Sequence, residues 1–155
     1  MVRFKPNRFS ITPNTNKDYI KYIDTSVFYV AIRSQENIEK YNLENFQNGI
    51  KFYGEGRIGH FKGINFNKAE SFDPKKASMG YYNYDGTNFY VEGISPVPSL
   101  VGSKYLLSKS KILIEQSSND TLILKNFKSA GGGGYTDKYV KRKIPKEALN
   151  YKPDW

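Results

Sequence analysis

The chain has 155 residues, enough for one domain with a substantial hydrophobic core. It carries 24 Lys and Arg against 15 Asp and Glu, a formal net charge of +9, and it has no cysteine, which excludes disulfides and thiolate metal sites. Its apolar runs, such as 27–32, are far shorter than the roughly 18 residues of a transmembrane segment. We expect a single β-rich domain over 1–155, with an irregular N-terminal segment at 1–25 and a C-terminal tail at 145–155.

The first part of the chain predicts two short helices. Thr15 is placed to cap a helix over 16–23, and Asp18 follows three residues later, as in a capping box. Ser34 is placed to cap a helical turn or two that end near Tyr41. Neither helix is long enough to form a layer of its own, so both are expected at the periphery of a sheet.

A strand and a hairpin are predicted next. Residues 26–33 form a strand candidate rich in aromatic and β-branched side chains. Asn48-Gly49 separates 43–46 from 50–53, and this dipeptide is typical of a tight hairpin turn with positive φ. The pattern therefore predicts a hairpin whose turn is Asn48-Gly49.

The segment from Gly54 to Gly59 matches the G-x-G-x-x-G pattern of a dinucleotide-binding turn. That turn needs a strand before it and a helix that starts within it, so that the phosphate meets a helix N-terminus. Residues 60–66 instead alternate like a strand. We interpret these glycines as points where a sheet bends or bulges, and we expect no cofactor.

The segment from Ser78 to Phe127 alternates short aromatic and β-branched runs with turn signals, which predicts a meandering antiparallel sheet. The expected hairpins join 79–84 to 89–94 through Asp85-Gly86, and 104–115 to 121–127 through 117–120. A last strand is expected over 135–144, after a mobile loop at Gly131 to Gly134, and a short helix starts at Pro145.

This spacing favours an all-β, mainly antiparallel fold of about eight strands, a sandwich or an up-and-down barrel or half-barrel, rather than βαβ units. Polar residues at 51, 53, 55 and 57 share one face of the predicted 50–58 strand, opposite Ile50 and Phe52, and that face is either solvent or a polar cavity. The tyrosines of the hairpin over 79–94 cannot all point inward, so several are exposed or surround a cavity. The candidate ligand-binding residues are Tyr53, Arg57, His60, Tyr82 and Tyr84.

No catalytic constellation or metal-ligand cluster is visible in the sequence. His60 is the only histidine, and one histidine without cysteine cannot build a usual metal site. The carboxylates are scattered, and no G-x-S-x-G elbow is present. We therefore predict that the protein is not an enzyme, and His60 and Glu55 are the first residues to mutate if activity is found.

The net positive charge favours an anionic partner, although a codon bias toward A and T would also produce it. The densest basic cluster is predicted on the last strand, where Lys141 and Lys143 share one face and Arg142 takes the other. The candidate partner-binding residues are Lys138, Lys141, Arg142 and Lys143. Binding of nucleic acid ranks last, because the basic residues do not lie between the aromatic ones.

Four segments, 22–30, 46–50, 80–92 and 120–124, supply an Asp-Thr entry, an Asn-Gly hairpin and a closing meander. In this pattern the chain resembles small lipocalin-like bacterial lipoproteins. The resemblance implies an antiparallel barrel in the cell envelope, in the periplasm or at the outer membrane, held by a lipidated N-terminal cysteine after export. The sequence contains neither that cysteine nor an export signal. The envelope location therefore requires that both belong to the native protein, and the cytoplasm is the alternative.

Three functions follow from these patterns. The first is a non-catalytic binding module that holds a small ligand or partner in the barrel mouth or on a sheet face. The second is a basic immunity or inhibitor-type protein that binds an acidic protein, and the third is a nucleic-acid-binding sheet. A large enclosed cavity favours the first, and a filled barrel with a continuous basic and aromatic surface favours the second.

Overall fold

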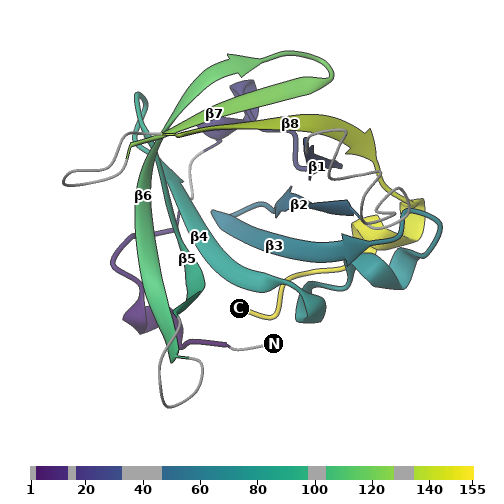
Figure 1. Ribbon diagram of the computed structural model, residues 1–155, viewed down its shortest axis with the longest axis horizontal. Coiled ribbons are helices and arrows are strands. Elements are labelled where there is room, and N and C mark those ends of the chain that lie inside the picture. Colours follow the sequence, from purple (N-terminus) through teal and green to yellow (C-terminus); the bar gives the residue numbers. More distant parts are fainter. Residues whose placement is uncertain (1–2, 14–16, 33–46, 98–103, 128–134) are drawn as a thin grey trace.

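A computed structural model describes residues 3–13, 17–32, 47–97, 104–127 and 135–155. Eight antiparallel strands close into an up-and-down barrel, in which each strand pairs with its neighbour in sequence and the last pairs with the first (Figure 1). The strands are β1 (Val27–Ala31), β2 (Gln47–Phe52), β3 (Arg57–Ile64), β4 (Ser78–Tyr84), β5 (Phe89–Val97), β6 (Lys104–Ser117), β7 (Thr121–Phe127) and β8 (Tyr135–Lys143). The predicted all-β antiparallel barrel is thus confirmed.

Short 3-10 helices accompany the strands: η1 (Pro6–Arg8), η2 (Asp18–Lys21), η3 (Ala69–Phe72), η4 (Pro74–Lys76) and η5 (Lys146–Asn150). Two of the predicted helices, over 16–23 and after Pro145, therefore appear as the single turns η2 and η5, although Thr15 and Asn16 lie outside the described residues. The helix predicted from Ser34 and the loop at Gly131 to Gly134 also lie outside them. No helix among the described segments is long and apolar enough to cross a membrane.

The β4–β5 hairpin has the turn that its sequence predicts. Gly86 has a φ of 98°, a value that favours glycine. The Asp85 carboxylate accepts the backbone N–H of Thr87 at 2.9 Å and that of Asn88 at 2.7 Å, which closes the turn. The turn between β6 and β7 also lies where predicted, at 118–120.

The turn predicted at Asn48-Gly49 is wrong, because both residues lie inside β2. The turn is formed by 53–56, where Glu55 and Gly56 have φ values of 59° and 73°, and it interrupts the strand predicted over 50–58. Gly49 is needed for a different reason. The pairing of β2 with β3 shifts between Gln47 and Gly49, as in a bulge, and a Cβ on Gly49 would lie 2.5 Å from Cε1 of Phe28.

One hydrophobic cluster lines the barrel lumen and fills part of it. Alternate residues of each strand point inward, and Tyr19 of η2 packs against them, with its ring centroid 5.4 Å from that of Tyr82. The buried members of this lumenal cluster are Tyr19, Ile23, Tyr29, Ile50, Phe52, Ile58, Tyr82, Tyr84, Phe89, Val91, Ile112, Leu122 and Leu124.

A second hydrophobic cluster lies on the outside of the barrel. There the N-terminal segment, η3, η4 and the C-terminal segment pack on outward residues of β1 to β5, and the two termini lie near each other (Figure 1). Arg3 and Asp154 form an ion pair across them, at 3.3 Å. The buried members of this outer cluster are Phe9, Ile11, Phe28, Tyr53, Phe61, Ile64, Phe72, Ala77, Met79, Tyr81, Ala148 and Trp155.

Candidate functional site

A cavity of about 310 Å³ lies in the lumen, toward the end of the barrel where β3 and β7 finish and β4 and β8 start. Its size is at the lower end of pockets that hold small molecules. The apolar part of the lining is Ile50, Phe52, Ile58, Val91, Ile94, Ile112 and Leu124. The polar part is His60, Lys62, Ser78, Ser108, Asn126, Asp137 and Tyr139.

Asn126 and Asp137 form a polar pair in this lumenal cavity. The buried Asn126 amide donates a hydrogen bond to the Asp137 carboxylate at 2.9 Å, across the β7–β8 pairing. Burial raises the pKa of Asp137, and the hydrogen bond from Asn126 opposes that rise. The carboxylate keeps a second oxygen with which to accept a hydrogen bond from a bound molecule.

His60 of β3 faces the same lumenal cavity. Burial within the barrel lowers the pKa of His60 to about 4, although its side chain is exposed to the cavity, where water would offset part of this effect. The imidazole is therefore neutral near neutral pH and offers one donor and one acceptor. Gly93 lies opposite, since a Cβ added there would be 3.8 Å from Nε2 of His60.

Tyr82 and Tyr84 lie in the packed part of the lumen, beyond the cavity. The Tyr82 hydroxyl donates to the carbonyl oxygen of Tyr53 and the Tyr84 hydroxyl to that of Gly86, each at 2.8 Å. The rings of Tyr84 and Phe89 stack at a centroid distance of 4.7 Å. Both hydroxyls thus have backbone partners, and the two side chains contribute to packing at this end of the barrel.

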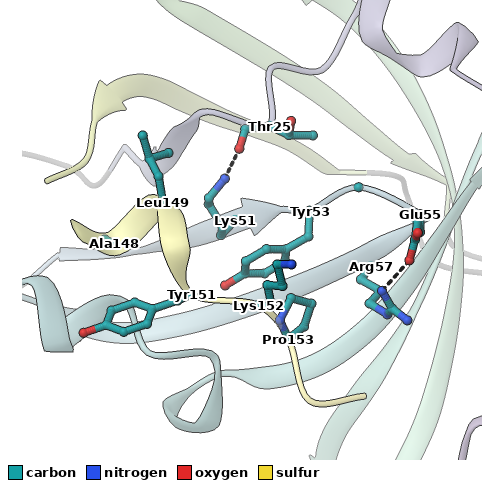
Figure 2. A pocket seen from close by; sticks show the side chains of 11 residues that line it. Thr25, Lys51, Tyr53, Glu55, Arg57, Ala148, Leu149, Tyr151, Lys152 and Pro153 are labelled. Atoms are coloured by element: carbon teal, nitrogen blue, oxygen red, sulfur yellow. Dashed lines mark hydrogen bonds and ion pairs between the residues drawn. The ribbon is translucent and has the colours of Figure 1, made fainter. Parts of the chain in front are cut away.

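A second cavity, of about 400 Å³, lies outside the barrel, beside the 53–56 turn and the C-terminal segment (Figure 2). We call it the outer pocket. It brings together Lys51, Tyr53, Glu55 and Arg57, the residues that the sequence places on one polar face. Leu149, Tyr151 and Lys152 complete it from the C-terminal side (Figure 2).

The predicted ligand-binding residues therefore do not form one site. Tyr53 and Arg57 line the outer pocket, His60 lines the lumenal cavity, and Tyr82 and Tyr84 pack beyond it. Sequence reasoning placed Lys51 on the polar face without choosing it as a ligand-binding residue, and it missed Asn126 and Asp137. A signal for Asn126 was present, since it follows Leu122 and Leu124 with the period of two that marks the inward face of β7.

The predicted partner-binding residues of β8 lie on two faces, as their alternation predicts. Lys141 donates to the carbonyl oxygen of Ser118 at 2.5 Å, and its ammonium lies 5.9 Å from the ring centroid of Tyr29 in the lumenal cluster. The Arg142 guanidinium lies outside, 4.5 Å from the ring centroid of Phe66. Lys138 and Lys143 are exposed.

Within the described ranges, no group of three or more His, Cys, Asp or Glu side chains is arranged to hold a metal ion. Comparison of the chain with protein-family models, with curated proteins and with solved structures gives no match.

Proposed function

We propose that this protein is a non-catalytic binding module that holds a small molecule in the lumen of its barrel. The observation that carries the proposal is the lumenal cavity of about 310 Å³, with an apolar wall and a few polar groups at defined positions. Small eight-stranded barrels are wide enough to hold one small ligand. The resemblance to lipocalin-like lipoproteins supports this role, and it alone supports a location in the cell envelope.

The lining indicates a ligand with an apolar body and a polar head. Phe52, Ile58 and Ile112 offer an apolar surface, while His60 and Asp137 offer hydrogen-bonding groups. The cavity has the volume of about ten water molecules at ~30 Å³ each, which suits a single alkyl chain or ring system. Decanol, decylamine and decanoate are suitable probes, because they share one body and differ in the charge of the head.

Gly93→Val tests this proposal by filling the cavity. A Cβ at this position meets its nearest atoms at 3.8 Å, so the valine fits the strand and its methyl groups occupy space beside His60. We expect the fold to be kept and the affinity for the probe that binds wild type best to fall about tenfold or more, since the apolar body loses its place. Isothermal titration calorimetry measures the affinity, and circular dichroism checks the fold.

Gly54→Val is the matched control, because Gly54 lines the outer pocket and not the lumenal cavity, and a Cβ there has only the Tyr19 hydroxyl within reach, at 3.9 Å. It should bind decanol, the uncharged probe, like wild type. Lumenal binding is refuted if none of the three probes binds wild type, or if Gly93→Val binds as tightly as wild type does.

A second candidate function, binding to an acidic protein, is favoured by the outer face of β6 to β8. This basic face consists of Lys109, Lys111, Leu113, Lys125, Lys138, Val140 and Arg142. Leu113 and Val140 are 41% and 37% exposed, and Glu115 on the same face is already 3.7 Å from the ammonium of Lys125. The segments that cover β1 to β5 do not bury these residues. The face therefore carries more positive than negative charge, beside exposed apolar side chains.

Charge reversal tests the second candidate. The double variant Lys111→Glu, Lys138→Glu should bind polyglutamate about tenfold more weakly than wild type at low salt, because two contacts to carboxylates become repulsive. Lys17→Glu, Lys76→Glu has the same net charge away from this face and should bind nearly as well as wild type. Equal losses in the two variants, or tighter binding to duplex DNA than to polyglutamate, would count against an acidic protein partner.

A further inference from the structure

Lys51 is a buried cation whose charge is poorly compensated. Its side chain is 5% exposed, and its ammonium donates to the backbone carbonyl oxygens of Thr25 and of Phe52, the latter at 3.1 Å. Among the described residues no carboxylate lies within ion-pair distance of it. The carboxylate that acts on it from further away, Asp24, accepts the N–H and hydroxyl of Ser26 at 2.7 and 2.6 Å. A buried ammonium without a counter-ion is costly.

The outer pocket gathers further positive charge around Lys51. Arg57 and Lys152 also line it, and the carboxylate in its lining, Glu55, is bound to Arg57 at 2.7 Å. In Figure 2 the Tyr53 ring lies between Lys51, which points toward Thr25, and the Arg57–Glu55 pair. The lining therefore has an excess of positive charge, and the Glu55 side chain, which is 75% exposed, forms only a surface ion pair with Arg57, a weak kind of interaction.

The same pocket has an apolar wall. The ring of Tyr53 is buried, and Leu149, Tyr151 and Pro153 of the C-terminal segment line the pocket with it. Burial raises the pKa of Tyr53, with Asp73 adding to the rise, so the hydroxyl stays neutral and adds no negative charge near Lys51. An aromatic or aliphatic body fits against these side chains, while an inorganic ion alone would leave them uncovered.

We propose that the outer pocket binds a small organic anion, whose phosphate or carboxylate group supplies the counter-charge of Lys51 and whose apolar body lies against Tyr53 and the C-terminal segment. The guanidinium of Arg57 is a second donor suited to either group, since its planar fork matches phosphate and carboxylate oxygens. This site is separate from the lumenal cavity, and it does not depend on the function proposed for that cavity.

The pH dependence of this binding has a definite sign. Burial lowers the pKa of Lys51 to about 8, against a smaller opposing effect of Asp24. The other charged groups that line the pocket are Glu55, Arg57 and Lys152. An anion binds the protonated form of Lys51 and so raises its pKa, and by linkage the affinity must fall as the pH rises from about 7 to about 9.

The test uses benzoate and phenyl phosphate, with benzamide as the neutral analogue of benzoate. We expect at least one anion to bind wild type about tenfold or more tightly than benzamide does, and to bind Lys51→Met about tenfold more weakly, because a charge-assisted contact is lost. Tighter binding of phenyl phosphate would assign the head group as phosphate, and tighter binding of benzoate would assign it as carboxylate. Equal affinities for benzoate, phenyl phosphate and benzamide would overturn the proposal.

Three further variants keep the test independent of folding. Lys51→Met leaves the carbonyls of Thr25 and Phe52 without their lysine partner, so Lys152→Met, at an exposed position, is measured beside it and should also weaken the anion. Lys17→Met removes an equal charge at an exposed position outside both the outer pocket and the basic face, and it should leave anion binding unchanged. Gly93→Val should leave anion binding intact, which separates this site from the lumen. Anion-induced NMR shifts confined to lumenal residues, or equal losses in Lys17→Met and Lys152→Met, would refute the site.

Discussion

Gly49→Ala is expected to lower the free energy of unfolding by about 3 kcal/mol, at the upper end of the cost of an overpacked core. The added methyl group would overlap the carbonyl oxygen of Tyr29 and lie 2.5 Å from Cε1 of Phe28. Neither the Tyr29 oxygen nor Cε1 of Phe28 has space to move away from the added methyl group. Tyr29 is held by the pairing of β1 with both β2 and β8, and the Phe28 ring is fully buried, with the rings of Phe61 and Phe72 within 5.7 Å of its centroid. Urea denaturation, followed by circular dichroism, measures the loss.

Gly54→Ala provides the control for this measurement, since the nearest atom to its new methyl group would be 3.9 Å away. It should change the free energy of unfolding by no more than about 0.5 kcal/mol, as surface substitutions usually do. If Gly49→Ala is as stable as wild type, the glycine is not required by the close approach of β1 and β2, and our account of this bulge is wrong.

Glu92→Ala is expected to cost about 2–4 kcal/mol and to release the N-terminal segment from β5. Glu92 is 4% exposed, and one of its carboxylate oxygens accepts the N–H of Ser10 at 2.6 Å, the Ser10 hydroxyl at 3.1 Å and the N–H of Ile11 at 3.0 Å. Alanine leaves the buried N–H of Ile11 without a partner, at a cost of about 1–3 kcal/mol, and it also removes the acceptor of the part-buried Ser10 N–H. Phe9 and Ile11, the neighbours of Ser10, would then pack less firmly against the other residues of the outer cluster.

Hydrogen exchange at residues 9–11, together with urea denaturation, measures this effect. Protection of these amides should fall more than that of β6 and β7, which do not contact the segment through Glu92. Glu115→Ala is the matched control, because it removes a carboxylate whose exposed pair with Lys125 is worth at most about 1 kcal/mol. Equal loss of stability in both variants would show that Glu92 does not anchor the segment.

The hairpins that the sequence predicts correctly are those whose turns are stabilised locally. Asp85 accepts hydrogen bonds from Thr87 and Asn88 and Gly86 supplies the positive φ, so this turn is closed by its own residues. Asn48-Gly49 is an equally strong local signal, but here the glycine is required by a backbone that is distant in sequence, that of Tyr29. Local patterns cannot distinguish a glycine that turns the chain from one that lets two strands approach.

The candidate sites were predictable to the extent that they follow strand alternation. The common face of Lys51, Tyr53, Glu55 and Arg57 is visible in the sequence, and these residues do line one pocket. Lys51 shares that pocket with Leu149 and Lys152 of the C-terminal segment, which is distant in sequence. Asp137 and His60 line the same lumenal cavity because the barrel closes through the pairing of β8 with β1. No short window of sequence contains that contact.

The seam between β1 and β8 also constrains the order in which the protein is able to fold. It pairs Val27 with Lys143 and Ala31 with Tyr139, so the first strand finds one of its two partners near the other end of the chain. Closing so long a loop is entropically costly, and non-local pairing of this kind slows folding. During synthesis on the ribosome, β1 emerges well before its partner β8. Until β8 is made, Phe28 and Tyr29 are incompletely covered, and the chain is then most prone to aggregation.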